Sequence, residues 1–106
     1  PYLRNTIERS GADSRDLWVW GAGRPARKCA QSLEAAWKKA AGFIDIDPAK
    51  IGRVIHDAPV VGLDNLPPKA NAVIVAYVGT RGAGETIRRD LVQRGWLEGI
   101  DFWIAA

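Results

Sequence analysis

The chain has 106 residues, of which 47% are hydrophobic and 25% charged, which is the size and composition of a single globular domain. Its net charge of +3 comes from fifteen basic residues scattered among twelve acidic ones, a pattern that argues against nucleic acid as a partner. No apolar run is long enough to span a membrane, no signal peptide is present, and the single cysteine excludes an internal disulfide. These features indicate a cytoplasmic protein.

The chain divides into a polar beginning and one domain. Residues 1–15 are polar and include a Ser-Gly-Ala-Asp-Ser run that is typical of a loop, so we expect a linker or docking segment there. Residues 16–106 are expected to form one folded domain. Because the chain begins at Pro1 and contains no methionine, we interpret it as a piece of a longer protein with a domain upstream.

The first predicted strand runs directly into a glycine-rich turn and a helix. The strand is expected over Asp16 to Trp20, of which Leu17 to Trp20 are all apolar, and it is followed by G-x-G-x-x-A over Gly21-Ala22-Gly23-Arg24-Pro25-Ala26. In a phosphate-binding turn the first glycine allows the tight turn, the second lets a ligand approach the backbone, and a small third residue packs helix against strand. We therefore expect Gly21, Ala22 and Gly23 to face an anion at the helix N-terminus, with Arg24 clamping its phosphate.

The helix and the strand that follow complete a βαβ unit. Apolar residues step by three and four from Ala26 to Lys38, with Cys29 on the buried side. Residues 41–48 then read as a strand that ends in acidic residues and stops at Pro48. Asp45 lies 24 residues after Gly21 (45 − 21), close to the spacing of the acid that binds ribose hydroxyls in dinucleotide folds.

Two other interpretations of Asp45 stay open. It could be a solvated carboxylate at an exposed strand end, where its loss would change stability little. With Asp47 it also forms a D-x-D, the pattern with which many sugar transferases hold a metal ion.

The second half of the chain supplies the rest of the sheet. Residues 53–61 predict two short extended pieces around a turn at Asp57-Ala58, one of them a third strand at the sheet edge, where Pro59 is tolerated. Residues 63–68 are too short and too rich in proline for a crossover helix. A fourth strand is expected over 71–79, a second helix from Ala83 to Gly95, and a last strand over 101–104. Together these elements predict a small doubly wound, mainly parallel Rossmann-like α/β sheet, with the strand order 3-2-1-4-5.

The predicted crevice lies where the two central strands end. A second glycine-rich loop follows the fourth strand, and its Gly79, Thr80 and Arg81 are expected to face the same crevice as the first turn. His56 is interpreted as a turn residue because no histidine or cysteine lies near it in sequence. No metal set, nucleophile or acid–base pair is evident, so we expect the domain alone to be non-catalytic.

Several segments together resemble a known family. They are Trp18-Val-Trp-Gly-Ala-Gly-Arg, Ala41-Gly-Phe-Ile-Asp-Ile-Asp-Pro-Ala-Lys-Ile-Gly, Pro59-Val-Val, Val75-Ala-Tyr-Val-Gly-Thr-Arg-Gly-Ala and Gly95-Trp-Leu-Glu-Gly-Ile-Asp-Phe. The chain resembles, over residues 16 to 106, the C-terminal Rossmann-like domain of some bacterial family 2 glycosyltransferases. It is more distantly similar to the nucleotide-sugar-binding N-terminal domain of sugar acyltransferases and to the C-terminal domain of some sugar C-methyltransferases.

This resemblance implies an accessory domain of a transferase whose catalytic part lies upstream in the same chain. In the acyltransferase relatives the matching glycine turn and acid lie at the nucleotide-sugar site, which maps onto Gly21, Gly23 and Asp45. Bulky Arg24 and Pro25 stand where small residues are common. Three hypotheses follow: a module that binds a nucleotide sugar or an NAD-like dinucleotide, a docking module with a vestigial site, and a fragment of an NAD-dependent oxidoreductase.

Overall fold

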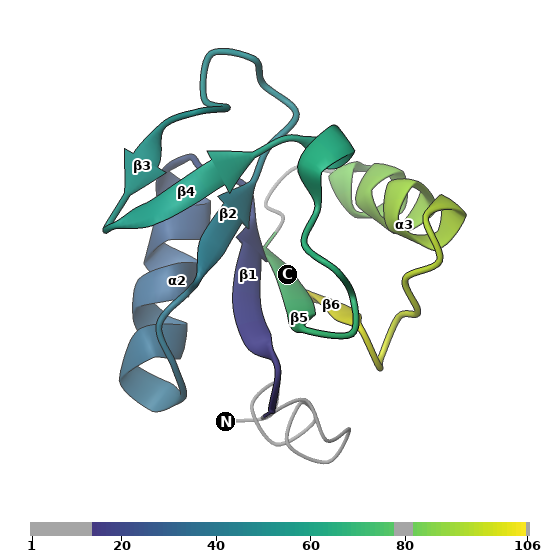
Figure 1. Ribbon diagram of the computed structural model, residues 1–106, viewed down its shortest axis with the longest axis horizontal. Helices are drawn as coiled ribbons and strands as arrows, with labels where there is room; N and C mark the ends of the chain where they lie inside the picture. Colours follow the sequence, from purple (N-terminus) through teal and green to yellow (C-terminus); the bar gives the residue numbers. More distant parts are fainter. Residues whose placement is uncertain (1–13, 78–81, 106) are drawn as a thin grey trace.

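The computed structural model describes residues 14–77 and 82–105 as an α/β domain with a mixed, mostly parallel sheet. The six described strands lie in the order β3-β4-β2-β1-β5-β6, and only the β3–β4 pairing is antiparallel (Figure 1). The strands are β1 (Asp16–Trp20), β2 (Gly42–Ile44), β3 (Val54–Ile55), β4 (Ala58–Val61), β5 (Ala72–Tyr77) and β6 (Phe102–Ala105). The helices are α2 (Arg24–Ala36), α3 (Ala83–Gln93) and the short 3-10 helix η2 (Leu63–Asn65).

The described helices cover the two faces of the sheet, one on each (Figure 1). Ala26, Ala30 and Leu33 of α2 pack in one core cluster, and Ile87 and Leu91 of α3 pack in the other. Because the central strands are covered on both faces, their side chains are apolar in both directions, as the continuous run in β5 shows. Neither helix is long and apolar enough to span a membrane, a statement that covers the described residues.

The predicted order of the five parallel strands agrees with the structure, which adds β3 as an antiparallel edge strand. The expectation that the strand with Pro59 lies at the edge is wrong, because β4 lies between β2 and β3. The turn of this hairpin is at His56-Asp57, one residue earlier than predicted, and both residues have positive φ, 50° and 67°. A two-residue hairpin turn of the primed type needs this conformation to match the strand twist.

The remaining boundaries shift by a few residues. Helix α2 begins at Arg24 rather than Ala26 and ends at Ala36 rather than Lys38, since Gly23 is its N-cap and Trp37 its C-cap. Helix α3 begins at Ala83 as expected. The connection from β4 to β5 contains only η2, as its prolines predicted.

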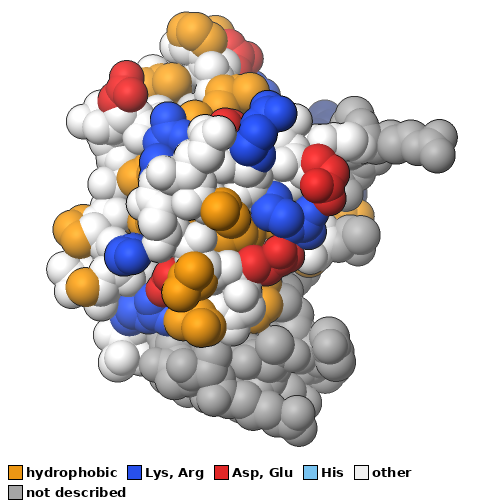
Figure 2. Space-filling view, turned by 90° about the vertical axis from the view of Figure 1, so that its right-hand side faces the viewer, with side chains coloured by type: hydrophobic (Ala, Val, Ile, Leu, Met, Phe, Trp, Pro, Cys, Tyr) orange, Lys and Arg blue, Asp and Glu red, His pale blue; other side chains and the backbone are white. Residues whose placement is uncertain are grey.

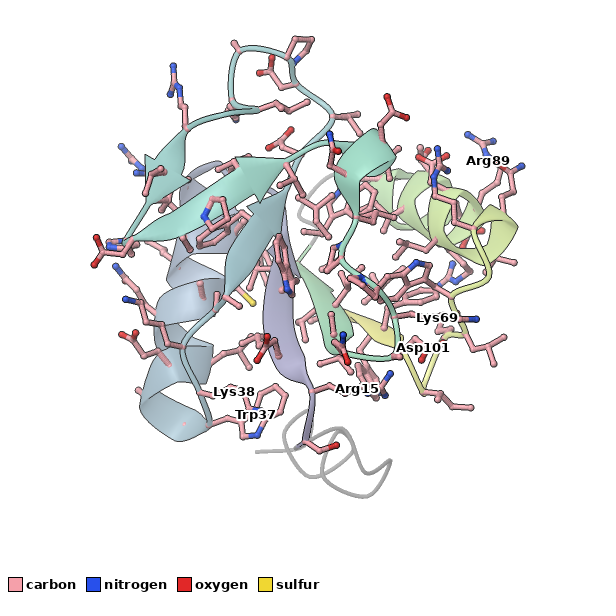
Figure 3. The ribbon with its side chains drawn as sticks, viewed as in Figure 1. Arg15, Trp37, Lys38, Lys69, Arg89 and Asp101 are labelled. Atoms are coloured by element: carbon pink, nitrogen blue, oxygen red, sulfur yellow. The ribbon has the colours of Figure 1, made fainter. Side chains whose placement is uncertain are left out.

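Arg15 joins the start of β1 to Asp101, the residue before β6 (Figure 3). Its guanidinium lies 2.8 Å from Asp101 Oδ1 and donates to the carbonyl oxygens of Lys69 (3.1 Å) and Ile100 (2.5 Å). Asp101 Oδ2 accepts the N–H of Leu97 at 2.9 Å, so the carboxylate is bonded at both oxygens. Arg15 thus packs as part of the domain, whereas residues 1–13 of the predicted linker lie outside the described residues.

Candidate functional site

In the glycine turn, Gly21 and Ala26 pack as the G-x-G-x-x-A pattern predicts. Gly21 ends β1 with φ +104°, a conformation that favours glycine, and its N–H donates to Ile44 O at 2.5 Å. A Cβ on Gly21 would lie 2.9 Å from the Cβ of Ala26, so strand and helix approach closely only because both residues are small. Gly23 is the helix N-cap and no side chain caps it. The turn therefore leaves its backbone open above Gly23.

Asp45 closes this turn rather than standing free at a strand end. Its Oδ2 accepts the N–H of Ala22 at 2.9 Å, and its Oδ1 accepts the N–H of Asp47 at 2.9 Å. The carboxylate is half-buried, which differs from the solvated strand-end interpretation. Asp45 therefore lies at the predicted place beside the glycine turn and holds the Ala22 amide that we expected to face an anion.

Asp47, the second acid of the D-x-D, accepts hydrogen bonds from nearby backbone N–H groups. Its Oδ1 accepts the N–H of Ala49 at 2.9 Å, and its carbonyl oxygen accepts the N–H of Lys50. These bonds form the turn that follows Pro48. Among the described residues no group of three His, Cys, Asp or Glu side chains is placed to hold a metal ion.

Lys50 is a residue of this site that sequence reasoning missed. Its Nζ lies 3.4 Å from the position that a Cβ on Gly23 would occupy, so an ammonium group covers the open face of the turn. The half-buried side chain reaches Gly23 from the turn that follows β2. Its position in the sequence could have located it. Lys50 comes a few residues after β2, the glycine turn comes directly after β1, and the carboxyl ends of neighbouring parallel strands meet at one sheet edge.

Arg24 is exposed beside the turn and lines two surface pockets. One of about 610 Å³ contains Tyr77 at the end of β5, and its other lining residues are Pro25, Lys28, Cys29 and Ser32. The other, of about 500 Å³, lies toward the β3–β4 hairpin. The structure thus brings Gly21, Ala22, Gly23, Arg24 and Asp45 together, whereas the predicted partners Gly79, Thr80 and Arg81 lie outside the described residues.

Cys29 and Trp20 both pack against the hydrophobic core. Cys29 is half-buried against the α2 core cluster, and burial raises the pKa of its thiol, which lowers the fraction of reactive thiolate. Trp20, the last residue of β1, is buried in the opposite core cluster.

The side of the domain formed by α3 and the loop after it is a mosaic of apolar and charged groups (Figure 2). Val92, Leu97 and Ile100 are about half exposed there. Arg88 forms ion pairs with Glu85 and Glu98 on the same side. These residues form a mixed apolar and charged surface.

No protein family, curated protein or solved structure was found to match the chain. The fold is accordingly defined by its own geometry, as a small α/β domain with a mixed, mostly parallel sheet that is loosely Rossmann-like.

Proposed function

We propose that this domain binds the diphosphate of a nucleotide sugar, or of a related nucleotide, at the glycine turn and serves a glycosyltransferase as a non-catalytic accessory domain. The observation that carries the proposal is the position of Lys50 Nζ over Gly23. The turn, the N-terminus of α2 and this ammonium group together offer backbone donors, a helix dipole and a positive charge to an anion.

Arg24 adds a second cation at the same edge. It is the first residue of α2, where a positive side chain opposes the helix dipole unless an anion lies nearby. A diphosphate bound over Gly23 would remove this unfavourable interaction and accept hydrogen bonds from both Arg24 and Lys50. Charge and backbone geometry therefore favour the same class of ligand.

Asp45 has two roles in this proposal. Its bonds to the N–H groups of Ala22 and Asp47 fix the turn in the shape that receives the ligand. Each carboxylate oxygen has a further lone pair, with which it can accept a ribose hydroxyl. Asp45 is thus a positioning residue first and a ribose acceptor second.

The glycosyltransferase assignment rests on the sequence resemblance of residues 16 to 106 and places the catalytic domain upstream in the same protein. The competing function is a docking module with a vestigial site. It is favoured by the loss of two donors from the turn, since the Ala22 amide is bonded to Asp45 and Pro25 has no N–H.

The two functions separate in a titration with UDP, a UDP-sugar, NAD and uridine by calorimetry or amide shifts. We expect UDP and the UDP-sugar to bind with micromolar to millimolar affinity, because an isolated domain lacks a closing partner surface. Lys50→Ala and Arg24→Ala should each weaken diphosphate ligands by about tenfold and leave uridine unchanged, since the lost contacts are to phosphate oxygens.

Arg53→Ala is the matched control, because Arg53 is an exposed cation in the same connection between β2 and β4. It should bind UDP as the native chain does. Equal affinity of the native chain, Lys50→Ala and Arg24→Ala for every ligand would remove the site assignment and favour the docking module.

A further inference from the structure

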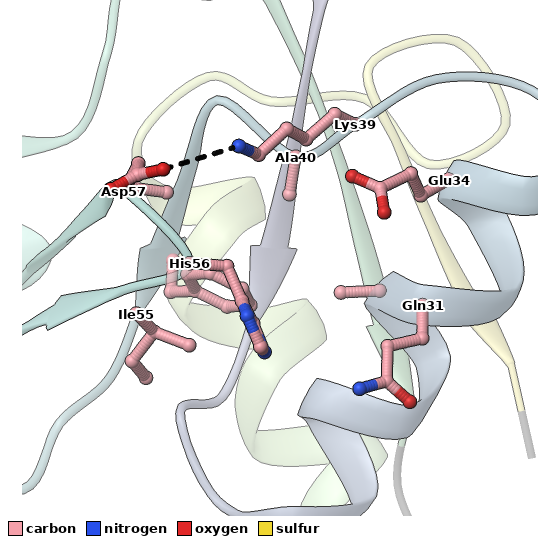
Figure 4. Close-up of a pocket in the computed structure, with 10 residues that line it drawn as sticks. Gln31, Glu34, Lys39, Ala40, Ile55, His56 and Asp57 are labelled. Carbon is pink, nitrogen blue, oxygen red and sulfur yellow. Dashed lines mark ion pairs between the residues drawn. The ribbon is translucent and has the colours of Figure 1, made fainter.

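Two pockets adjoin along α2 on the side that faces the β3–β4 hairpin. The first, of about 500 Å³, is lined by Arg24, Arg27, Lys28, Gln31 and His56. The second, of about 260 Å³, lies further along the helix (Figure 4), and its lining consists of Ala30, Gln31, Glu34, Lys39, Ala40, Phe43, Ile55, His56, Asp57 and Ala58. Gln31 and His56 line both pockets, so the two lie side by side, and we call them together the α2 groove.

The groove has a topological cause. In a doubly wound sheet a helix normally connects neighbouring parallel strands, but β2 and β4 are connected by a turn and the edge strand β3. Along this part of the described chain α2 therefore has no neighbouring helix on its face of the sheet. The space beside it is bounded by the hairpin instead.

The second pocket has an apolar floor made of core side chains. Phe43 is 1% exposed, Ala58 is 2% exposed and Ala40 is 6% exposed, and all three belong to the cluster under α2. Ala40 and Ala58 have small side chains, which leave space above them in the pocket. An apolar ring could rest on this surface without displacing a polar group.

The hairpin turn places His56 at the junction of the two pockets. His56 and Asp57 both have left-handed backbone conformations, as the two-residue hairpin turn requires. In Figure 4 the side chains of Gln31 and Glu34 on α2 lie across the opening from Ile55 and His56. The imidazole and the Gln31 amide can each donate a hydrogen bond at the junction.

Charge is distributed unevenly along the groove. The end near the start of α2 carries Arg24, Arg27 and Lys28, and its described lining includes no acidic side chain. The far end carries Glu34, and Lys39 lies 3.9 Å from Asp57 in a loose ion pair. An anion is therefore favoured at one end only, and the apolar floor lies beyond it.

We propose that the α2 groove binds a small organic phosphate whose phosphate group contacts Arg24, Arg27 and Lys28 and whose apolar ring rests on the floor formed by Phe43 and Ala58. From Arg27 to Glu34 the helix rises by about 10 Å, which sets the length of such a ligand. The site is separate from the glycine turn except that Arg24 borders both.

The probe for this proposal is 4-phenylbutyl phosphate, titrated into the 15N-labelled chain beside inorganic phosphate and 4-phenylbutanol. The phosphate carries a charge of about −1.5 to −2 at pH 7, and the linker lets the ring reach the apolar floor. We expect it to bind about tenfold more tightly than either fragment, because one molecule then engages both pockets. Amide shifts should extend from residues 27–31 to residues 55–58. Equal affinity for 4-phenylbutyl phosphate and inorganic phosphate would overturn the proposal.

Variants locate the site. Arg27→Glu removes a cation from one end, and Gln31→Trp places a bulky group at the junction; both positions are exposed on α2, so folding should be preserved. Each should weaken the probe at least fivefold, whereas Arg89→Glu, an exposed change on α3, should not. Shifts confined to residues 21–24, or unchanged binding of the probe in Arg27→Glu, would contradict ligand binding in the α2 groove. Neither result would contradict diphosphate binding at the glycine turn.

Discussion

The carboxylate of Asp45 accepts the N–H of Ala22 at 2.9 Å, which joins the end of β2 to the glycine turn that follows β1. The same side chain accepts the N–H of Asp47 through its other oxygen. One residue thus links the two segments that form the candidate site. The shape of the turn depends on a bond across the sheet edge as well as on its glycines.

Asp45→Ala should lower the free energy of unfolding by about 1–3 kcal/mol, because it leaves two backbone N–H groups without their acceptor. Asp45→Asn, which keeps one carbonyl acceptor, should lose less. Urea denaturation of the three proteins measures both effects. A loss under about 0.5 kcal/mol in Asp45→Ala would show that the carboxylate does not hold the turn.

Gly42→Ala should destabilise the domain by about 1–3 kcal/mol through overpacking. Trp18 is the register partner of Gly42, and a Cβ on Gly42 would lie 2.2 Å from the Trp18 ring. The double variant Trp18→Leu/Gly42→Ala relieves this clash, so its loss should be smaller than the sum of the two single losses. Thermal or urea unfolding of all four proteins completes the cycle, and strict additivity would argue against the contact.

Breaking the Arg15–Asp101 ion pair should cost about 3 kcal/mol, because removing one partner leaves the other charge buried. The two side chains are only 14% and 9% exposed. Asp101→Asn and Arg15→Ala should both show the loss by urea denaturation. Lys39→Ala, which removes the exposed pair to Asp57, should change stability by less than about 0.5 kcal/mol. Similar losses of stability in all three variants would contradict the difference between the buried and the exposed ion pair.

The ion pair between Arg88 and Glu98 predicts a pH dependence. The hydrogen bond from Arg88 lowers the pKa of Glu98 below its ordinary value of 4.5. A lowered folded-state pKa gives stability that is present above the unfolded value and is lost as the pH falls through the folded one. Glu98→Gln should therefore be less stable than the native chain at pH 7. The difference in urea midpoint should disappear below the lowered pKa, and a difference that persists there would have another cause.

The sequence specified the sheet well because its signals were local and repeated. The strand predicted over Asp16–Trp20 matches β1 to the residue. The glycine turn, the amphipathic pattern of α2 and the apolar β5 predicted a parallel order that the structure also has. The edge strand was harder to assign. Val54–Ile55 has only two residues, and its pairing depends on a His56-Asp57 turn without the usual glycine.

The candidate site was predicted only in part, because hydrogen bonds between distant residues leave no periodic pattern. Spacing placed Asp45 beside the glycine turn but could not show that its oxygens point at Ala22 and Asp47. Lys50 lies 27 residues after Gly23 (50 − 23) in a turn, and only the fold brings its ammonium to the glycine. The α2 groove likewise could not be predicted, because it exists only since β2 and β4 are connected by a turn and β3 instead of a helix.

The most direct test of the proposed function is amide shift mapping of the 15N-labelled chain with UDP at millimolar concentration. The account predicts saturable shifts at residues 21–27 and at Lys50, with much smaller shifts at the same positions for uridine, since the contacts are to phosphate. An absence of shifts at residues 21–27 with millimolar UDP and UDP-sugar would contradict nucleotide binding at the glycine turn and leave the docking module as the function.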